Sequence, residues 1–133
     1  MSLELNKQIA SRLIESIGNG RVDDNPFADD FAVWTSSSGN IAGAEWRRRG
    51  KRIKEITRSG VLPLKVIGLT AEGERVAVQA VADAELTDGT QYHNDYHFLV
   101  VIRGGKICNV FEYMNTKVAL EQVLPLIRAL PPQ

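Results

Sequence analysis

The chain has 133 residues, which is enough for one domain and too few for two, so residues 1–133 are taken as a single domain. Its 16 Lys and Arg residues balance 16 Asp and Glu residues, and this zero net charge argues against nucleic acid or an anionic membrane as partners. The single cysteine, Cys108, excludes an internal disulfide and a cysteine-based metal cluster. The polar start and the lack of any run near ~18 apolar residues predict a cytoplasmic protein without a membrane span.

The first half of the chain predicts two helices with a short strand between them. Leu5, Ile9, Leu13 and Ile17 recur every four residues, as on one face of an amphipathic helix, and the Gly18-Asn19-Gly20 segment ends that helix. A short apolar strand is expected over residues 31–35, a loop over 36–40, and a second helix over 44–57.

The second half predicts four extended segments joined by tight turns. Glycine-containing pairs end the first three segments, and Asp88-Gly89 is the strongest hairpin signal among them. Asn115-Thr116 can cap a last helix, in which Pro125 is expected to cause a kink. The four strands are expected over residues 62–70, 75–86, 90–103 and 106–114.

This order of elements predicts an α+β fold. A long meander of strands twists and cannot stay flat, so we expect a cone-shaped curved antiparallel sheet with three helices packed on its concave side. A pocket for a small molecule is then expected between the sheet and the helices.

Two motifs resemble those of the nuclear-transport-factor-2-like superfamily, in its SnoaL-like and ketosteroid-isomerase-like branch. The first is FADDFAVW at 27–34, and the second is NDYHFLVVIRGGKI at 94–107 with EYMNT at 112–116. With the helix order, the resemblance covers nearly the whole chain. It implies the cone fold, but this fold serves isomerases, cyclases, dehydratases, epoxide hydrolases and non-enzymatic binders.

The resemblance also argues against one reaction. Steroid isomerases of this fold use a carboxylate base, a tyrosine and a protonated aspartate, and these positions fall on Thr35, near Leu13 and near Phe98. A hydroxyl group and two hydrocarbon side chains cannot perform that chemistry. The chain is therefore not expected to be a ketosteroid isomerase.

Glu112 is the leading catalytic candidate. It stands in an otherwise apolar strand, and the resemblance places it on the concave face, where burial would raise the pKa of its carboxyl group and suit it to acid or base catalysis. Its alternative is a carboxylate at the pocket rim, paired with Arg75 or Arg103. Tyr96 and Asn94 on the preceding strand are expected to orient a substrate by hydrogen bonds.

Asp83 is a second catalytic candidate, for which the sequence gives conflicting signals. The resemblance turns Gln79 and Asp83 into the pocket, where Asp83 could pair with Glu112 as acid and base. Yet the alternate residues, from Val76 to Ala84, form the more apolar face, which normally packs in the core. In that case Asp83 is a solvated residue.

The remaining candidates line the pocket or lie outside it. His93 and His97 share a strand face and could bind metal, but no third ligand is evident, so we expect no metal. The resemblance places both on the outer face, and a flipped register would instead make His97 a base in the pocket. The basic segment 46–54 is interpreted as an ion-paired helix surface rather than an anion or RNA site. The ligand-binding residues expected in the pocket are Trp34, Trp46, Gln79, Phe98, Met114 and Thr35.

The leading functional hypothesis is therefore an enzyme without a cofactor. It would perform acid/base chemistry of the isomerase, dehydratase, cyclase or hydrolase type on a mostly apolar substrate. The alternative is a non-catalytic binding domain for a hydrophobic ligand or a protein partner. A homodimer is expected through the outer sheet face, where Leu99, Val101 and Phe111 would lie.

Overall fold

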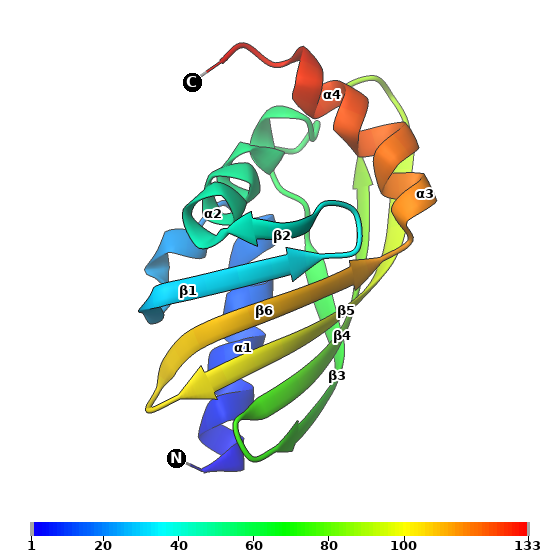
Figure 1. Ribbon diagram of the computed structural model, residues 1–133. Coiled ribbons are helices and arrows are strands. Elements are labelled where there is room, and N and C mark those ends of the chain that lie inside the picture. The colour runs from blue at the N-terminus through cyan, green and yellow to red at the C-terminus, as the bar shows by residue number, and fades with distance from the viewer. Residues whose placement is uncertain (1, 133) are drawn as a thin grey trace.

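A computed structural model describes residues 2–132 and contains one curved, six-stranded sheet (Figure 1). The strand order is β2-β1-β6-β5-β4-β3, and the sheet does not close on itself. The strands are β1 (Phe27–Thr35), β2 (Gly39–Ala42), β3 (Leu64–Glu72), β4 (Arg75–Glu85), β5 (Gln91–Arg103) and β6 (Lys106–Met114). The predicted α+β cone is confirmed.

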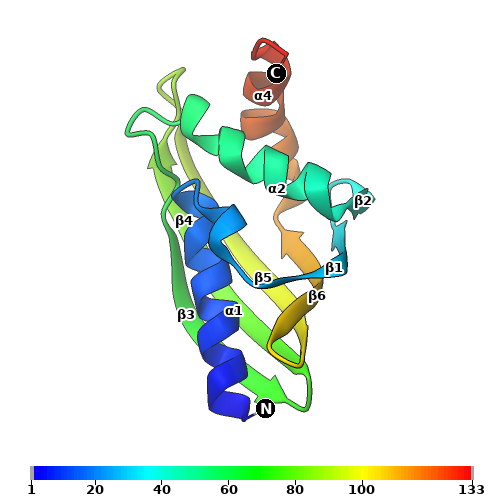
Figure 2. The ribbon, with the colours of Figure 1, turned by 90° about the vertical axis from the view of Figure 1, so that its left-hand side faces the viewer.

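The helices gather on the concave side of the sheet (Figure 2). The N-terminal helix α1 (Leu3–Gly18) lies along β3 and β4, and α2 (Gly43–Arg52) crosses the wide end of the cone. A C-terminal helical segment follows β6 and comprises α3 (Thr116–Val118), a π-helical turn (Ala119–Val123) and α4 (Leu124–Ala129). Short 3₁₀ turns cover Val22–Asp24 and Ile53–Glu55. Within residues 2–132, no helix combines the length and apolarity needed to cross a membrane.

The sheet is mixed rather than wholly antiparallel, which corrects the sequence-based expectation. Strands β3 to β6 form the predicted antiparallel meander, but β1 pairs with β6 in parallel. No turn joins β1 to β6, so hairpin geometry does not set their relative direction. The predicted loop at 36–40 is instead a tight turn into β2, made possible by Gly39 at φ 71°.

The core-facing side of β4 is the apolar one, and the inward placement of Gln79 and Asp83 is wrong. Val76, Val78 and Ala82 are fully buried, whereas Gln79 and Asp83 alternate with them on the exposed convex face. Because side chains alternate along a strand, the resemblance had placed this strand one position out of register.

The C-terminal helical segment departs from α geometry where the kink was predicted. Pro125 lacks an N–H group, and its ring conflicts with the carbonyl of a preceding turn. The chain accommodates this with the π-helical turn, in which the Leu124 N–H bonds to the Ala119 carbonyl five residues earlier. No residue of this segment within the described chain is fully buried, so it covers the wide end of the cone rather than filling the core.

A close backbone approach fixes the end of α1 against the chain that leads into β3. The Leu62 N–H donates to the Gly18 carbonyl at 2.7 Å. A Cβ atom at position 18 would lie 1.7 Å from the Leu62 carbonyl oxygen, so only glycine fits this crossing.

Candidate functional site

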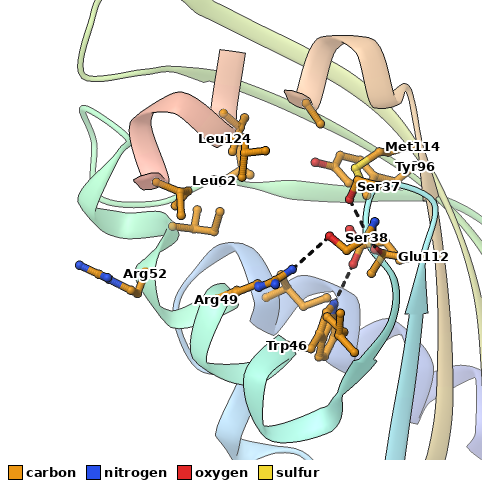
Figure 3. Close-up of a pocket in the computed structure, with 18 of the residues that line it drawn as sticks. Ser37, Ser38, Trp46, Arg49, Arg52, Leu62, Tyr96, Glu112, Met114 and Leu124 are labelled. Carbon is orange, nitrogen blue, oxygen red and sulfur yellow. Dashed lines mark hydrogen bonds between the residues drawn. The ribbon is translucent and has the colours of Figure 1, made fainter. Parts of the chain in front are cut away.

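A cavity of about 630 Å³ lies between the sheet, α2 and the C-terminal helical segment (Figure 3). This volume is in the range of small-molecule sites, roughly 300–1,000 Å³. Side chains from β1, β5, β6 and α2 form one end, and those of the C-terminal helical segment complete the other. The predicted pocket between sheet and helices is therefore present.

Glu112 points into this cavity from the middle of the sheet. It is flanked by Thr35 on β1 and Phe98 on β5, and the Trp46 indole N–H from α2 donates to its carboxyl oxygen at 2.8 Å. Burial raises the pKa of the Glu112 carboxyl group, while the Trp46 hydrogen bond and the charge of Arg49 oppose that rise only in part. The carboxyl group is therefore suited to holding a proton at a higher pH than an exposed glutamate.

A chain of hydrogen bonds on β5 ends at the cavity wall. The Asn94 side-chain amide donates to the Tyr92 hydroxyl at 2.9 Å, and the Tyr92 and Tyr96 hydroxyls lie 2.7 Å apart. Burial raises the pKa of both phenols, that of Tyr96 well above its ordinary value, so both stay neutral. When Tyr92 donates to Tyr96, the Tyr96 hydroxyl is free to donate to a ligand oxygen.

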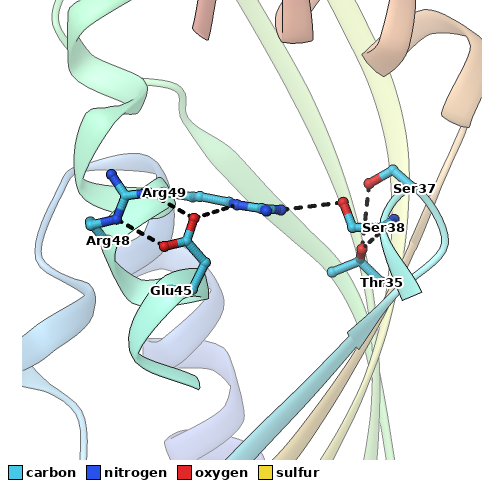
Figure 4. Close-up of polar contacts among 6 residues, drawn as sticks. All are labelled: Thr35, Ser37, Ser38, Glu45, Arg48 and Arg49. Carbon is cyan, nitrogen blue, oxygen red and sulfur yellow. Dashed lines mark hydrogen bonds and ion pairs between the residues drawn. The ribbon is translucent and has the colours of Figure 1, made fainter. Parts of the chain in front are cut away.

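A polar cluster from α2 and the β1–β2 turn forms the rim beside Glu112 (Figure 4). The Arg49 guanidinium binds Glu45 through Nε at 3.1 Å and donates from Nη1 to the Ser38 hydroxyl at 3.2 Å. The Ser38 N–H donates to the Thr35 hydroxyl, which lies 3.4 Å from that of Ser37. This cluster presents several hydrogen-bond donors to the cavity.

The opposite end of the cavity is mostly apolar, with Arg52 and Arg128 as its charged residues. Leu62 and Leu124 mark this end in Figure 3, away from Glu112 and the two serines. Its wall combines the loop before β3, the end of α2 and the C-terminal helical segment. The residues concerned are Ile53, Leu62, Leu64, Leu120, Val123, Leu124 and Ile127.

Six of the ten predicted site residues line this one cavity. They come from three strands and one helix, and no two of them are adjacent in sequence. They are Glu112, Tyr96, Trp46, Phe98, Met114 and Thr35. The alternative pairing of Glu112 with Arg75 or Arg103 does not occur, because its carboxyl group bonds to Trp46 and Arg103 pairs with Glu74.

The other four do not line the cavity, and for three of them the predicted inward position is wrong. Asp83 is on the convex face, 2.7 Å from His93, and Gln79 lies on the same face beside Gly68. Trp34 also faces outward, because Val33 and Thr35 occupy the inward positions of β1. It packs on Tyr113 with ring centroids 5.1 Å apart.

Asn94 is inward but does not reach the ligand space. It is fully buried, its amide nitrogen donates to Tyr92 and to the Asn115 carbonyl, and its oxygen accepts from the Asn115 N–H. The predicted direct contact with substrate is thus replaced by a positioning role behind Tyr92 and Tyr96.

Several cavity residues were missed by the sequence analysis. Arg49 was assigned to the solvated helix surface, yet it lies three residues after Trp46 and so on the same helix face. Tyr92 alternates with Asn94 and Tyr96, which would have placed it inward too. No pattern in the sequence marks Ser37 and Ser38, because a turn brings them to the rim.

The remaining charged candidates lie on the convex face of the sheet and on α2. His93 lies on the outer face, and its pKa is raised by Asp83 and, to a lesser extent, by Asp95. Among residues 2–132, no three His, Cys, Asp or Glu side chains are arranged to hold a metal ion. The basic face of α2 is largely ion-paired, with Arg47 and Lys51 on Asp23 and with Arg52 on Glu55.

Comparison with known proteins identifies the fold. No protein-family model matches the sequence, and no curated protein matches it. Among solved structures, a hypothetical protein with a ketosteroid isomerase-like fold from Catenulispora acidiphila, in complex with trimethylamine, has a TM-score of 0.70 and 17% identity, covering 94% of this chain and 98% of its own. A candidate SnoaL-like polyketide cyclase from Jannaschia has a TM-score of 0.71 and 18% identity, covering 96% and 94%.

A de novo designed protein with a curved β-sheet matches nearly as well. Its TM-score is 0.69 at 13% identity, covering 98% of this chain and all of its own. Similarity at these identities reports backbone geometry and leaves the chemistry to the side chains. The chain has the curved-sheet fold of the nuclear-transport-factor-2-like superfamily, shared with ketosteroid isomerase-like and SnoaL-like proteins.

Proposed function

We propose that the protein is an enzyme that performs cofactor-free acid/base chemistry on a mostly apolar small molecule in the cavity. The observation that carries this proposal is the Glu112 carboxyl group, which is desolvated, held by Trp46 and open to the cavity. A carboxyl group with a raised pKa can both give and accept a proton near neutral pH. The candidate cyclase from Jannaschia supports the same class of reaction.

Glu112 and Tyr96 have complementary roles in this proposal. As an acid, Glu112 donates a proton to a leaving-group or carbonyl oxygen of the substrate. As a base, it removes a proton from the carbon next to the carbonyl group. Tyr96 donates a hydrogen bond to the oxygen on which negative charge develops, and the Asn94–Tyr92 pair holds it in place. Trp46, Phe98 and Met114 form the surrounding wall and exclude water. Isomerisation, dehydration, cyclisation and hydration all fit this arrangement.

The test is a Glu112→Gln variant assayed against a panel of enones, β-hydroxy ketones, linear β-keto esters and epoxides. Glutamine keeps the acceptor for Trp46 but cannot transfer the proton, so we expect kcat to fall by roughly 10²- to 10⁴-fold. Glu121→Gln, which changes an exposed carboxylate on the C-terminal helical segment, is the matched control. A normal kcat in the Glu112 variant would show that Glu112 is not the catalytic acid or base.

A second candidate function is a non-catalytic binding domain. It is favoured by Leu13, Thr35 and Phe98, which stand where the resemblance implies, respectively, the tyrosine, the carboxylate base and the protonated aspartate of steroid isomerases. The bound trimethylamine in the Catenulispora protein supports small-molecule occupancy under either function. Carboxyl ¹³C NMR separates the two: a Glu112 that titrates like a free glutamate favours the binder.

The predicted homodimer and cytoplasmic location belong to the same proposal. Leu99, Val101 and Phe111 are half-buried on the convex face, next to the Trp34–Tyr113 stack. Covering this surface with a second copy would remove apolar area from water. Cys108 is a free thiol, as suits a reducing compartment.

A further inference from the structure

The cavity is polarised, with its donors at one end and its hydrocarbon wall at the other. In Figure 3, Ser37, Ser38 and Glu112 gather on one side, and Leu62 and Leu124 lie on the other. A ligand that fills both ends must therefore be amphiphilic, with an oxygen-bearing head and an apolar body. The charges of the residues at the rim indicate which charge this head group should carry.

The rim beside the polar end carries an excess of positive charge. Glu45 is shared by two guanidinium groups, at 2.7 Å from Arg48 and 3.1 Å from Arg49, so two positive charges meet one negative charge. Counting all the lining residues gives four arginines and two carboxyl groups. These are Arg48, Arg49, Arg52 and Arg128, against Glu45 and Glu112.

Glu112 offsets this excess less than an exposed glutamate would. Burial raises the pKa of its carboxyl group, so the protonated, neutral form persists to a higher pH than in an exposed glutamate. Arg52, by contrast, is balanced on the far side of α2 by Glu55 and by the Pro131 carbonyl. Arg128, on α4 beside Ile127, forms no ion pair within residues 2–132 and adds a positive charge away from the rim. At the polar end, the uncompensated charge lies at Arg48 and Arg49.

Arg49 is also oriented for an anion. Glu45 binds its Nε, and Nη1 donates to the Ser38 hydroxyl (Figure 4), so the guanidinium has further N–H groups that can donate to a ligand. Because the Ser38 oxygen accepts from Arg49, its own proton is free to be donated. A guanidinium and a hydroxyl side by side match the two oxygens of a carboxylate.

We propose that the substrate is an amphiphilic carboxylic acid, whose carboxylate binds Arg49 and Ser38 and whose apolar body lies along Leu62 and the C-terminal helical segment. The inference rests on the proposed function, since it takes this cavity as the substrate site. It places the reacting carbons of the acid beside Glu112 and Tyr96, between head and body.

The test compares three probes of equal chain length in isothermal titration calorimetry: decanoate, 1-decanol and decylamine. A charge-assisted bond to arginine is about twice as strong as a neutral one, so we expect decanoate to bind at least about tenfold more tightly than decanol. Decylamine should bind more weakly than both. Equal affinity for decanoate and decanol, or a preference for decylamine, would overturn the proposal.

Two variants locate the head group. Arg49→Gln should abolish the preference for decanoate while leaving decanol affinity unchanged. Arg47→Gln makes the same charge change on the same helix, but Arg47 pairs with Asp23 outside the cavity, so the preference should survive. If Arg49→Gln keeps the preference, the assignment is wrong, and the wild-type probe series remains decisive if that variant does not fold.

These outcomes are separable from those of the proposed function. If Glu112→Gln turns over normally while the wild-type protein still prefers decanoate, the catalytic role fails and the ligand class stands. If Glu112→Gln is inactive but decanol binds as well as decanoate, only the ligand class is overturned.

Discussion

At the scale of single residues, the surroundings of one carboxyl group decide what the cavity can do. Glu112 exchanges water for an indole N–H, a phenylalanine and a threonine, and only one of these contacts is a hydrogen-bond donor to it. The Asp83 carboxylate on the convex face differs, because it remains exposed to water beside His93. Two acidic residues on one sheet therefore have different surroundings because they point to different faces.

The raised pKa of Glu112 predicts a pH-dependent stability. The folded state keeps its proton where the unfolded chain has lost it, so this contribution is complete below the ordinary value of 4.5 and disappears as pH rises through the folded pKa. Each unit of pKa difference corresponds to about 1.4 kcal/mol. In urea unfolding from pH 4 to 8, Glu112→Gln should gain stability relative to wild type as pH rises. A constant difference across this range would contradict the prediction, and Glu121→Gln should show no such trend.

Asp83→Asn tests the corrected position of Asp83. The Asp83 carboxylate is the largest cause of the raised pKa of His93, so the variant should lower that pKa toward 6.5, as followed by histidine NMR. Asp95→Asn, whose carboxylate lies 3.4 Å from the other ring nitrogen, should have a smaller effect. If Asp83→Asn shifts the titration of Glu112 instead, Asp83 acts in the cavity after all.

At the scale of elements, the junction between β6 and the C-terminal helical segment depends on a side chain from β5. Asn94 bonds to both backbone groups of Asn115, whose own side chain caps α3 by accepting from the Val118 N–H. The same Asn94 amide donates to Tyr92. One buried amide thus links the start of the cavity-covering helical segment to the tyrosine pair.

Asn94→Leu should therefore destabilise the protein and disturb the site together. Losing two part-buried hydrogen bonds to the Asn115 backbone should cost about 1–3 kcal/mol in total, measurable by urea unfolding. The Tyr96 side chain should also lose its fixed position, seen as averaged ring signals in NMR. Asn109→Ala, on the half-exposed outer side of β6, serves as the control and should change little. Wild-type stability in Asn94→Leu would show that this junction is held by other contacts.

The elements differ in how far the sequence could predict them. The β5–β6 hairpin was predicted well, because alternation places Tyr96, Phe98 and Glu112 once a single residue is placed. On β4 the alternation is equally clear, and the apolar residues do face the core. The family resemblance indicated the opposite face, and following it gave the wrong orientation for Gln79 and Asp83. The approach of Ser38 to Arg49 could not be predicted, since it depends on how a turn and a helix meet in space.

At the scale of the whole molecule, both faces of the sheet carry apolar side chains, but the helices cover only the concave face. The convex face carries Leu99, Val101 and Phe111 among polar residues, and Tyr113 is 45% exposed there. The solvent-exposed face of an antiparallel sheet normally carries polar side chains. The composition of this face is the reason to expect a partner sheet.

Leu99→Glu should accordingly convert a dimer into a monomer. A charge buried between two apolar faces has no partner and costs more than the contact provides. Sedimentation velocity at micromolar concentration should show a dimer for wild type and a monomer for the variant. Leu5→Glu, at a 39% exposed position on α1, is the control and should remain dimeric. A monomeric wild-type protein would contradict the prediction.

The crossing of Gly18 and Leu62 has a consequence for ligand size. Leu62 forms part of the apolar end wall of the cavity, and its backbone is held against α1 only because position 18 has no side chain. A methyl group there would collide with the Leu62 backbone, so the end of α1 or this part of the cavity wall would have to move. The longest ligand that the cavity accepts is thus limited by a residue that never touches it, and chain-length selectivity could change through position 18 while the reacting groups stay as they are.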